Sequence, residues 1–226
     1  MNTDIHSSVN VAWEPKRVVI FDKNFLSRNA AYAILKDVYP ESMVSDSEEL
    51  IDAITLIEEE SKLQLPCLLI IDFSGDQEAP LIFFNKIKCC FLINPNLKVV
   101  VYTSVEDCFF IASISSFISG GVLLKKESML SMKKMLHSLR TGFQVVFSAS
   151  VNQLIGDYRM PSVSPKALQG YFAEIAEHQL SSSSVKTGSK YKTFCTRRYS
   201  TLEKLGFKRV RQYYTYLSKI NNMLYR

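Results

Sequence analysis

Four polar residues each follow directly after an apolar run in the first two thirds of the sequence: Asp22, Asp72, Thr103 and Lys125. A carboxylate such as Asp72 could accept a phosphoryl group as a nucleophile. A second carboxylate, Asp22, could help to hold Mg²⁺. A hydroxyl and an ammonium group could contact the phosphoryl oxygens. These residue types predict a phosphoryl site with Asp72 as phosphoacceptor and with Asp22 and Asp72 as Mg²⁺ ligands.

The elements that must position these residues alternate regularly along the chain. Short apolar runs predict five strands, and stretches with apolar residues three and four positions apart predict a helix after each strand. Strands this uniformly apolar are buried on both faces, which is typical of a parallel sheet covered by helices. The fold class is therefore α/β, a doubly wound (βα)5 sheet, and the carboxyl ends of its strands gather the four polar residues at one edge. The predicted strands are 17–21, 43–44, 67–71, 97–102 and 122–124, and the predicted helices are 24–38, 47–57, 81–92, 105–118 and 128–139.

This arrangement resembles the receiver domain of bacterial response regulators over residues 16–142. The resemblance implies that Asp72 is the phosphoacceptor, Thr103 the switch hydroxyl and Lys125 the conserved lysine of the pocket, with Mg²⁺ as cofactor if the receiver is active. Receivers carry two adjacent acids after the first strand, whereas Asp22 is followed by Lys23. Lys23 could neutralise the pocket without a metal or point to solvent. A further alternative is a non-signalling receiver in which Asp72 and Lys125 form an ion pair.

Charge is distributed unevenly along the 226 residues. Residues 163–226 carry twelve Lys or Arg and three Glu, whereas the whole chain has a net charge of only +5. Such a basic segment favours a polyanionic partner, although a solvated basic face would show the same charge. Residues 143–162 contain Gly156 and Pro161, show no clear periodicity, and are interpreted as a linker before this segment.

The segment Lys192–Gly206 has the pattern of a helix that reads the major groove of DNA. Apolar residues cluster on one side of the helix, and short hydroxyls and cations lie on another, where they could contact bases and phosphates. Periodicity alone is equally compatible with a surface amphipathic helix. The residues expected to contact DNA are Lys190, Lys192, Thr193, Thr196, Arg197, Arg198 and Ser200.

The same segment resembles the recognition helix of the LuxR/FixJ (NarL)-type response regulators, through Lys192-Thr193 and Lys204-Leu205-Gly206. Val163–Lys166 matches the start of that family's helix-turn-helix domain, and the likeness is greatest to the RcsB-like capsule regulators and their auxiliary relatives. Arg197 replaces the family's His or Gln, and serines 182–184 stand where the scaffold helix has an apolar core. The resemblance implies an all-α four-helix domain over 163–226, whose last helix forms a dimer contact. The dimer contact is expected at Tyr213, Tyr214 and Leu217, unless this face only closes a small core.

These features predict a sequence-specific regulator of transcription that binds double-stranded DNA. We expect it to be cytoplasmic, with no membrane partner, and to act as a homodimer or as a heterodimer with a response regulator. The alternatives are a conventional regulator activated by phosphorylation, and a receiver-fold interaction module that does not bind DNA. An enzyme is not expected, because the sequence has no nucleophile–base pair, Gly-rich phosphate loop or metal-ligand spacing. The five cysteines include no C-x-x-C pair, which argues against a zinc site.

Overall fold

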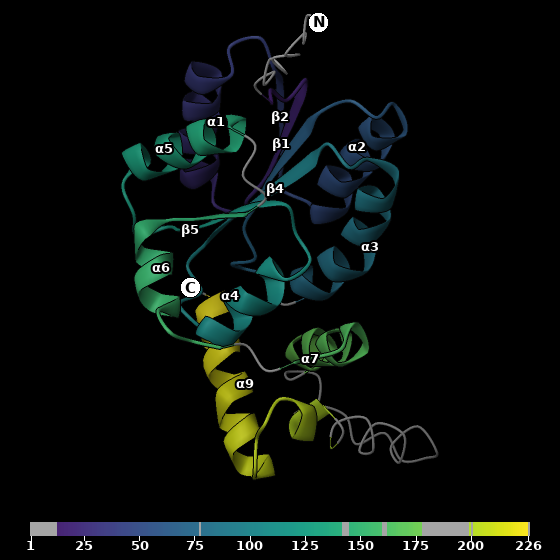
Figure 1. Cartoon of the computed structure of the whole chain (residues 1–226), viewed down its shortest axis with the longest axis vertical. Helices are drawn as coiled ribbons and strands as arrows, with labels where there is room; N and C mark the ends of the chain where they lie inside the picture. The colour runs from purple at the N-terminus through teal and green to yellow at the C-terminus, as the bar shows by residue number, and fades with distance from the viewer. Residues whose placement is uncertain are drawn as a thin grey trace, which may run out of the picture.

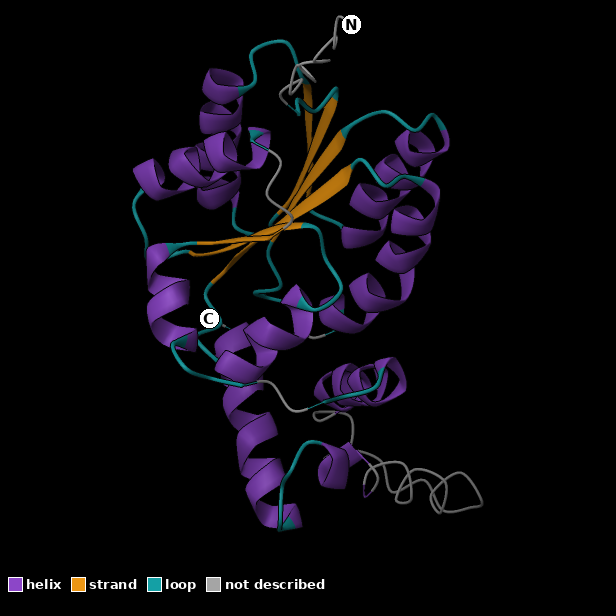
Figure 2. Ribbon diagram, in the orientation of Figure 1, coloured by secondary structure: helices purple, strands orange, loops and turns teal. Residues whose placement is uncertain are grey.

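The computed structural model describes residues 13–76, 78–141, 145–159, 162–177, 199 and 201–225. One parallel sheet with strand order β2-β1-β3-β4-β5-β6 lies at its centre, with helices on both faces (Figure 2). This confirms the predicted α/β class. The strands are β1 (Arg17–Phe21), β2 (Met43–Ser47), β3 (Cys67–Ile71), β4 (Leu97–Thr103), β5 (Gly120–Leu124) and β6 (Val145–Phe147). The helices are α1 (Phe25–Val38), α2 (Leu50–Lys62), α3 (Ala79–Ile93), α4 (Cys108–Ser115), α5 (Met129–Arg140), α6 (Ala149–Ile155), α7 (Pro165–Glu177) and α9 (Val210–Leu224).

The side chains of the sheet divide between two apolar clusters because successive residues of a strand point to opposite faces. Val18 and Ile20 of β1 pack in the cluster beneath α1 and α5. Val19 and Phe21 pack in the cluster on the other face, where α2 and α3 lie (Figure 1). The uniformly apolar strands are therefore needed to fill both cores.

Side-chain caps begin the helices that follow the polar strand ends. The Asn24 side chain accepts a hydrogen bond from Ser27 N at the start of α1, and the Ser128 side chain accepts one from Ser131 N at the start of α5. Caps of this kind stabilise a helix by about 1 kcal/mol. They fix where the two helices begin, directly beyond Asp22 and Lys125.

The predicted linker at 143–162 is wrong in its middle part, which adds a sixth strand and a helix to the sheet domain. In β6, Val145–Phe147 pair in parallel with Gly120–Val122 of β5. The Ser148 side chain then caps α6 by accepting from Val151 N. A three-residue strand is too short to show a period, so the sequence pattern could not reveal this element.

Gly120 begins β5, two residues before the predicted strand at 122–124. Its φ is +144°, and an added Cβ would lie 2.0 Å from Val99 O on the neighbouring strand. Only glycine permits β4 and β5 to approach this closely.

The C-terminal helices share a core with the sheet domain. Tyr171 and Phe172 of α7 are fully buried, and the Phe172 ring lies 5.4 Å from Phe84 of α3 and 6.3 Å from Phe110 of α4, between centroids. The apolar cluster on the α2–α3 face of the sheet thus continues into α7 and α9, which lie beyond the carboxyl edge of the strands (Figure 1). Within the described ranges, no helix combines the length and the apolar character needed to cross a membrane.

Candidate functional site: a lysine-bridged acidic pocket and a basic helical end

The four polar residues predicted at the strand ends are brought together, and Lys125 links the two acids. Its Nζ lies 2.7 Å from Asp22 Oδ2 and 2.6 Å from Asp72 Oδ2. Both carboxylates are almost fully buried, at 2% and 1% exposure. The arrangement therefore contains the ion pair between Asp72 and Lys125 that one of the sequence interpretations proposed.

Burial and charge act in opposite directions on this pair. Burial raises the pKa of the Asp72 carboxyl, and the attraction of Lys125 offsets the rise only in part. Burial acts to lower the pKa of Lys125, but Asp72 and Asp22 together outweigh it and raise that pKa. The charged ammonium form of Lys125 is therefore stabilised, whereas the charged carboxylate form of Asp72 is destabilised by desolvation.

Two hydroxyls join the pocket beside Thr103. Thr103 is fully buried at the end of β4, and its Oγ1 accepts a hydrogen bond from Val105 N at 3.2 Å. Ser74 Oγ donates to Asp72 Oδ1 at 3.1 Å and lies 2.7 Å from Ser104 Oγ. The loops after β3 and β4 are therefore joined at the pocket through the two serines, which the sequence pattern did not single out.

Lys23 forms an ion pair within the loops of the pocket. Its Nζ lies 3.2 Å from Asp76 Oδ2 in the loop between β3 and α3, and its side chain is 38% exposed. The other Asp76 oxygen accepts hydrogen bonds from Glu78 N and Ala79 N, which begin α3. Lys23 therefore bridges the loops after β1 and β3.

The pocket does not fit the magnesium ion that the family resemblance implies. Mg²⁺ requires oxygen ligands in near-octahedral geometry, and here the two available carboxylates are both in contact with the Lys125 ammonium. The position after Asp22 supplies a cation instead of a third acid. Among the described residues no group of three or more His, Cys, Asp or Glu could hold a metal.

A buried arginine that the sequence analysis missed fixes the turn after β1. Arg28, 4% exposed, donates to the carbonyl of Asp22 at 2.6 Å, to Asp46 at 2.8 Å and to Glu48 at 2.5 Å. Burial acts to lower its pKa, but Glu48 and Asp46 outweigh this and raise the pKa. The helical spacing of residues 24–38 does not indicate that Arg28 is buried, or that its acidic partners are Asp46 of β2 and Glu48 directly after that strand.

The residues predicted to contact DNA lie outside the described residues. These are Lys190, Lys192, Thr193, Thr196, Arg197, Arg198 and Ser200. The end of the same predicted helix is described, and its expected apolar side is buried at Thr201, Leu202 and Leu205. Thr201 packs closely against α7, since its Oγ1 lies 2.7 Å from where a Cβ on Gly170 would be.

Gly206 ends this helix as the sequence predicted. Its φ is +77°, its N–H donates to Glu203 O, and Phe207 N donates to Leu202 O. This hydrogen-bond pattern is the Schellman C-cap, in which the positive φ favours glycine.

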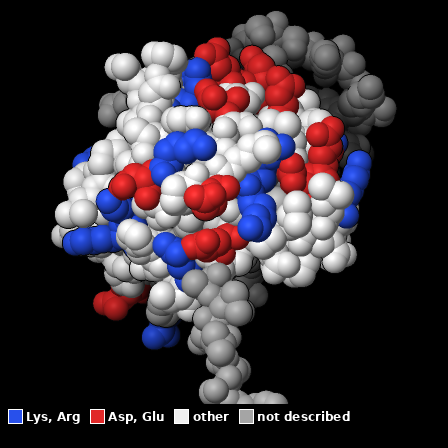
Figure 3. All heavy atoms as spheres, turned by 90° about the horizontal axis from the view of Figure 1, so that it is seen from above, with Lys and Arg blue, Asp and Glu red and all other residues white. Residues whose placement is uncertain are grey.

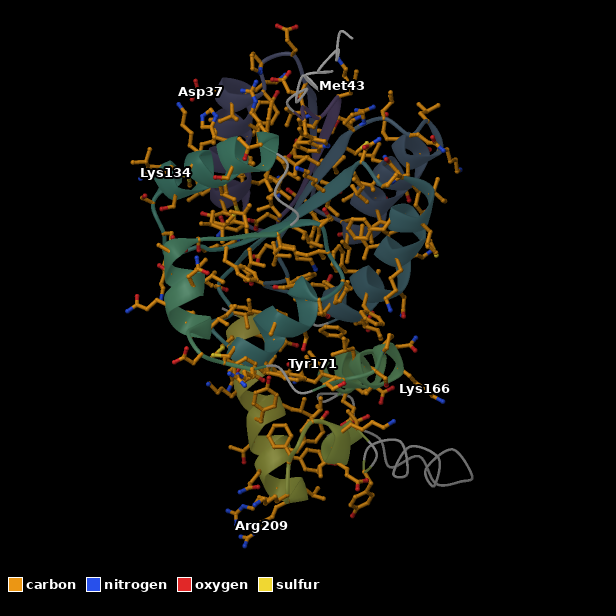
Figure 4. All side chains as sticks on the ribbon, in the orientation of Figure 1. Asp37, Met43, Lys134, Lys166, Tyr171 and Arg209 are labelled. Carbon is orange, nitrogen blue, oxygen red and sulfur yellow. The ribbon has the colours of Figure 1, made fainter. Side chains whose placement is uncertain are left out.

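Exposed basic side chains lie on both sides of this cap in the sequence, most of them just after it. Figure 4 shows Arg209 at the end of the molecule farthest from the sheet, where α9 begins. These cations contribute to the basic charge of residues 163–226, and the run Lys208-Arg209-Val210-Arg211 lies beyond the segment that predicts the DNA contact. The exposed set is Lys204, Lys208, Arg209 and Arg211.

Two of the three residues predicted for a dimer contact are packed inside one chain. Tyr213 and Leu217 are both fully buried in the cluster that joins α7 and α9 to the sheet. Tyr214 is half-buried. In this arrangement the alternative interpretation holds for Tyr213 and Leu217, which close a core.

A hydrogen-bonded pair of tyrosines connects α9 to α4. The Tyr216 hydroxyl donates to Asp107 Oδ1 at 2.8 Å and lies 3.0 Å from the Tyr171 hydroxyl. Asp107 also caps α4 by accepting from Phe110 N. Its carboxylate therefore joins a helix start in the sheet domain to the last helix of the chain.

Comparison with known proteins identifies a shared fold. No protein-family model matches the sequence, and no curated protein sequence is found to be similar. Over 92% of its length the chain superposes on all of RcsB from Salmonella enterica serovar Typhimurium, bound to a promoter in the presence of phosphomimetic BeF3−, with 20% identity and a TM-score of 0.60. It also superposes over 91% on all of a two-component response regulator RcsB–DNA complex, with 20% identity and a TM-score of 0.59.

A structure of two RcsB dimers bound to two parallel DNAs gives the same result, with a TM-score of 0.55 and 23% identity over 92% of this chain and all of the other. The likeness includes both the sheet domain and the C-terminal helices. The chain therefore has the overall fold of RcsB, a response regulator of the LuxR/NarL family.

Proposed function

We propose that this protein is a transcription regulator that binds double-stranded DNA through its C-terminal helices, with an atypical receiver domain. The observation that carries the proposal is the fold shared along almost the whole chain with RcsB structures solved on DNA. The segment Lys192–Gly206 supports it, because its described end, from Thr201 onward, packs on α7 and stops at Gly206.

The distribution of charge supports the same end of the molecule as the DNA contact. The exposed cations are Lys204, Lys208, Arg209 and Arg211, which flank or begin α9. Figure 4 shows Arg209 of this set at the end remote from the sheet. The opposite end, viewed in Figure 3, has cations and anions interspersed. Phosphate contacts need a surface of one sign, so the C-terminal end is the better candidate.

The proposed DNA contacts divide into two classes. Arg197, Lys192 and the neighbouring hydroxyls of the predicted helix would read base edges. The cations after Gly206 would contact phosphates and carry no sequence information. Binding as a homodimer, or as a heterodimer with a response regulator, would place two such surfaces on two half-sites.

Fluorescence anisotropy with duplex DNA selected from a random library tests the proposal on the full chain. The observed binding constant should fall steeply with salt, with a log–log slope of about −0.9 for each phosphate contacted. Arg197→Ala should cost on the order of 1–3 kcal/mol at the selected site, whereas Arg209→Ala should reduce the salt slope by about one without changing the preferred sequence. If the chain fails to bind any duplex at low salt, alone or with a partner response regulator, the remaining candidate is an interaction module.

We further propose that the receiver domain is not switched by ordinary Mg²⁺-dependent phosphorylation of Asp72. Lys125 is shared by the two carboxylates, and Lys23 stands at the position of the second acid. Beryllofluoride with Mg²⁺, added at millimolar concentration, should leave the NMR spectrum and the melting temperature unchanged. A specific shift of the resonances around Asp72 would instead establish the conventional, phosphorylated regulator.

A further inference from the structure

The last turn of α9 docks on the loop between β3 and α3, close to Asp72. Gly75 N donates a hydrogen bond of 2.5 Å to the carbonyl of Leu224. Leu224 is the last residue of α9, so its carbonyl has no partner within the helix. The amide of Gly75 supplies that partner from a segment 149 positions earlier in the chain.

The turn that presents this amide has an unusual backbone. Gly75 has a φ of +79°, a backbone conformation that residues other than glycine rarely adopt. The turn begins at the pocket, where the Ser74 hydroxyl donates a hydrogen bond to Asp72. It ends at the start of α3, where the Asp76 carboxylate accepts hydrogen bonds from Glu78 N and Ala79 N. Its shape is therefore fixed at both ends.

Lys23 contacts this turn twice. Its Nζ lies 3.2 Å from Asp76 Oδ2, and its Cδ lies 3.5 Å from the point where a Cβ on Gly75 would be. The aliphatic stem thus covers the glycine, while the ammonium holds the acid next to it. A shorter or an acidic side chain at this position could not make both contacts.

We propose that Lys23 is a built-in cation that holds the β3–α3 turn in the conformation that receives the carboxyl end of α9. The docking of the C-terminal helices then needs no divalent ion in the pocket. Lys23 acts as a positioning residue, through Asp76 and Gly75, and not by contact with α9 itself.

The pocket and α9 are linked through this turn. Asp72, Ser74, Gly75 and Leu224 form a continuous run of hydrogen bonds and chain neighbours. A change at the Asp72 carboxylate would act first on Ser74 and then on the amide that holds α9. The proposal concerns this contact alone, and it stands whether or not the protein binds DNA.

Hydrogen exchange at the Gly75 amide, measured by NMR on the full chain in EDTA, tests the proposal. The amide should be protected in the unmodified protein without any metal. Lys23→Met keeps the stem but removes the charge and should speed exchange about two- to fivefold, as expected for a half-exposed ion pair. Lys23→Arg should retain protection. Lys126→Met is the matched control, because it breaks an exposed pair with Glu106 on a neighbouring loop.

Two outcomes would overturn the proposal. One is a Gly75 amide that exchanges freely in EDTA and is protected only after Mg²⁺ is added. The other is a Gly75 amide that exchanges at the same rate in Lys23→Met as in Lys126→Met, while Gly75→Ala, which strains the turn directly, speeds amide exchange at the carboxyl end of α9. In that case the turn would receive α9 without help from Lys23.

Discussion

Replacing Tyr216 by phenylalanine isolates the polar part of the contact between α9 and the sheet domain. The ring would keep its neighbours, Phe207 at 5.2 Å and Phe109 at 6.5 Å, so apolar burial is unchanged. Burial, together with Tyr171 and Asp107, raises the pKa of the Tyr216 hydroxyl, which is therefore a donor throughout the neutral range. The substitution removes that donor from the Asp107 carboxylate.

The expected cost follows from the two hydrogen bonds of this hydroxyl. A hydrogen bond to a charged group contributes about 1.5–3 kcal/mol. The fully buried Tyr171 hydroxyl would also lose its hydrogen-bond acceptor, the Tyr216 oxygen 3.0 Å away. Asp107 retains its bond from Phe110 N, which limits the loss on that side. We expect the free energy of unfolding to fall by about 2–3 kcal/mol, near the upper end of common single substitutions.

Urea denaturation of the full chain at pH 7 measures this change, with the melting temperature as a second observable. Tyr32→Phe on the exposed side of α1 is the matched control and should change stability by less than about 0.5 kcal/mol. Adding Tyr171→Phe to Tyr216→Phe should recover part of the loss, because the buried hydroxyl left without an acceptor is then gone. The reasoning is refuted if Tyr216→Phe is as stable as Tyr32→Phe.

Three further predictions concern the pocket and the helix packing. Asp72→Asn should stabilise the protein at pH 7 by about 1 kcal/mol, because the folded-state pKa of Asp72 is raised. Calorimetry should show this gain in stability disappear as the pH falls below the pKa of an unfolded aspartate. A gain that persists in acid would contradict this cause. Lys23→Asp would place three carboxylates around the pocket and should create Mg²⁺ binding that calorimetric titration detects, whereas Lys23→Asn should not. Gly170→Ala would bring a methyl group within 2.7 Å of Thr201 Oγ1. This should displace the helix that ends at Gly206 and weaken DNA binding, as measured by fluorescence anisotropy. An unchanged affinity would show that this packing does not position the DNA contact.

Much of the sheet domain could be predicted because its signals are local. The buried runs 17–21 and 67–71 match β1 and β3, and Asp22 and Asp72 could be placed at one edge from the parallel topology alone. The ion pair between Asp72 and Lys125 also follows from that edge and was one of the interpretations, whereas the second contact of Lys125, with Asp22, was not predicted.

The remaining features depend on contacts between distant segments, which periodicity does not encode. Nothing near Lys23 in the sequence indicates Asp76 as its partner, and nothing near Gly75 indicates Leu224. The aromatic residues of α7 and α9 were visible, but a helix that packs in its own domain and one that packs on a neighbour show the same pattern. The pattern therefore leaves open whether Tyr213 and Leu217 form a dimer contact or close a core, and one chain buries both completely.

The apolar cluster that continues from the sheet into α7 has a consequence for work with fragments. A polypeptide cut at residue 163 would leave Tyr171 and Phe172 without the phenylalanines of α3 and α4 that cover them. Two aromatic side chains of this kind expose roughly 300–500 Å² of surface, which is as large as the biggest apolar patch on most soluble monomers. Such a fragment would tend to self-associate, and an oligomeric state measured on it would reflect that exposed apolar surface and not the assembly of the intact chain.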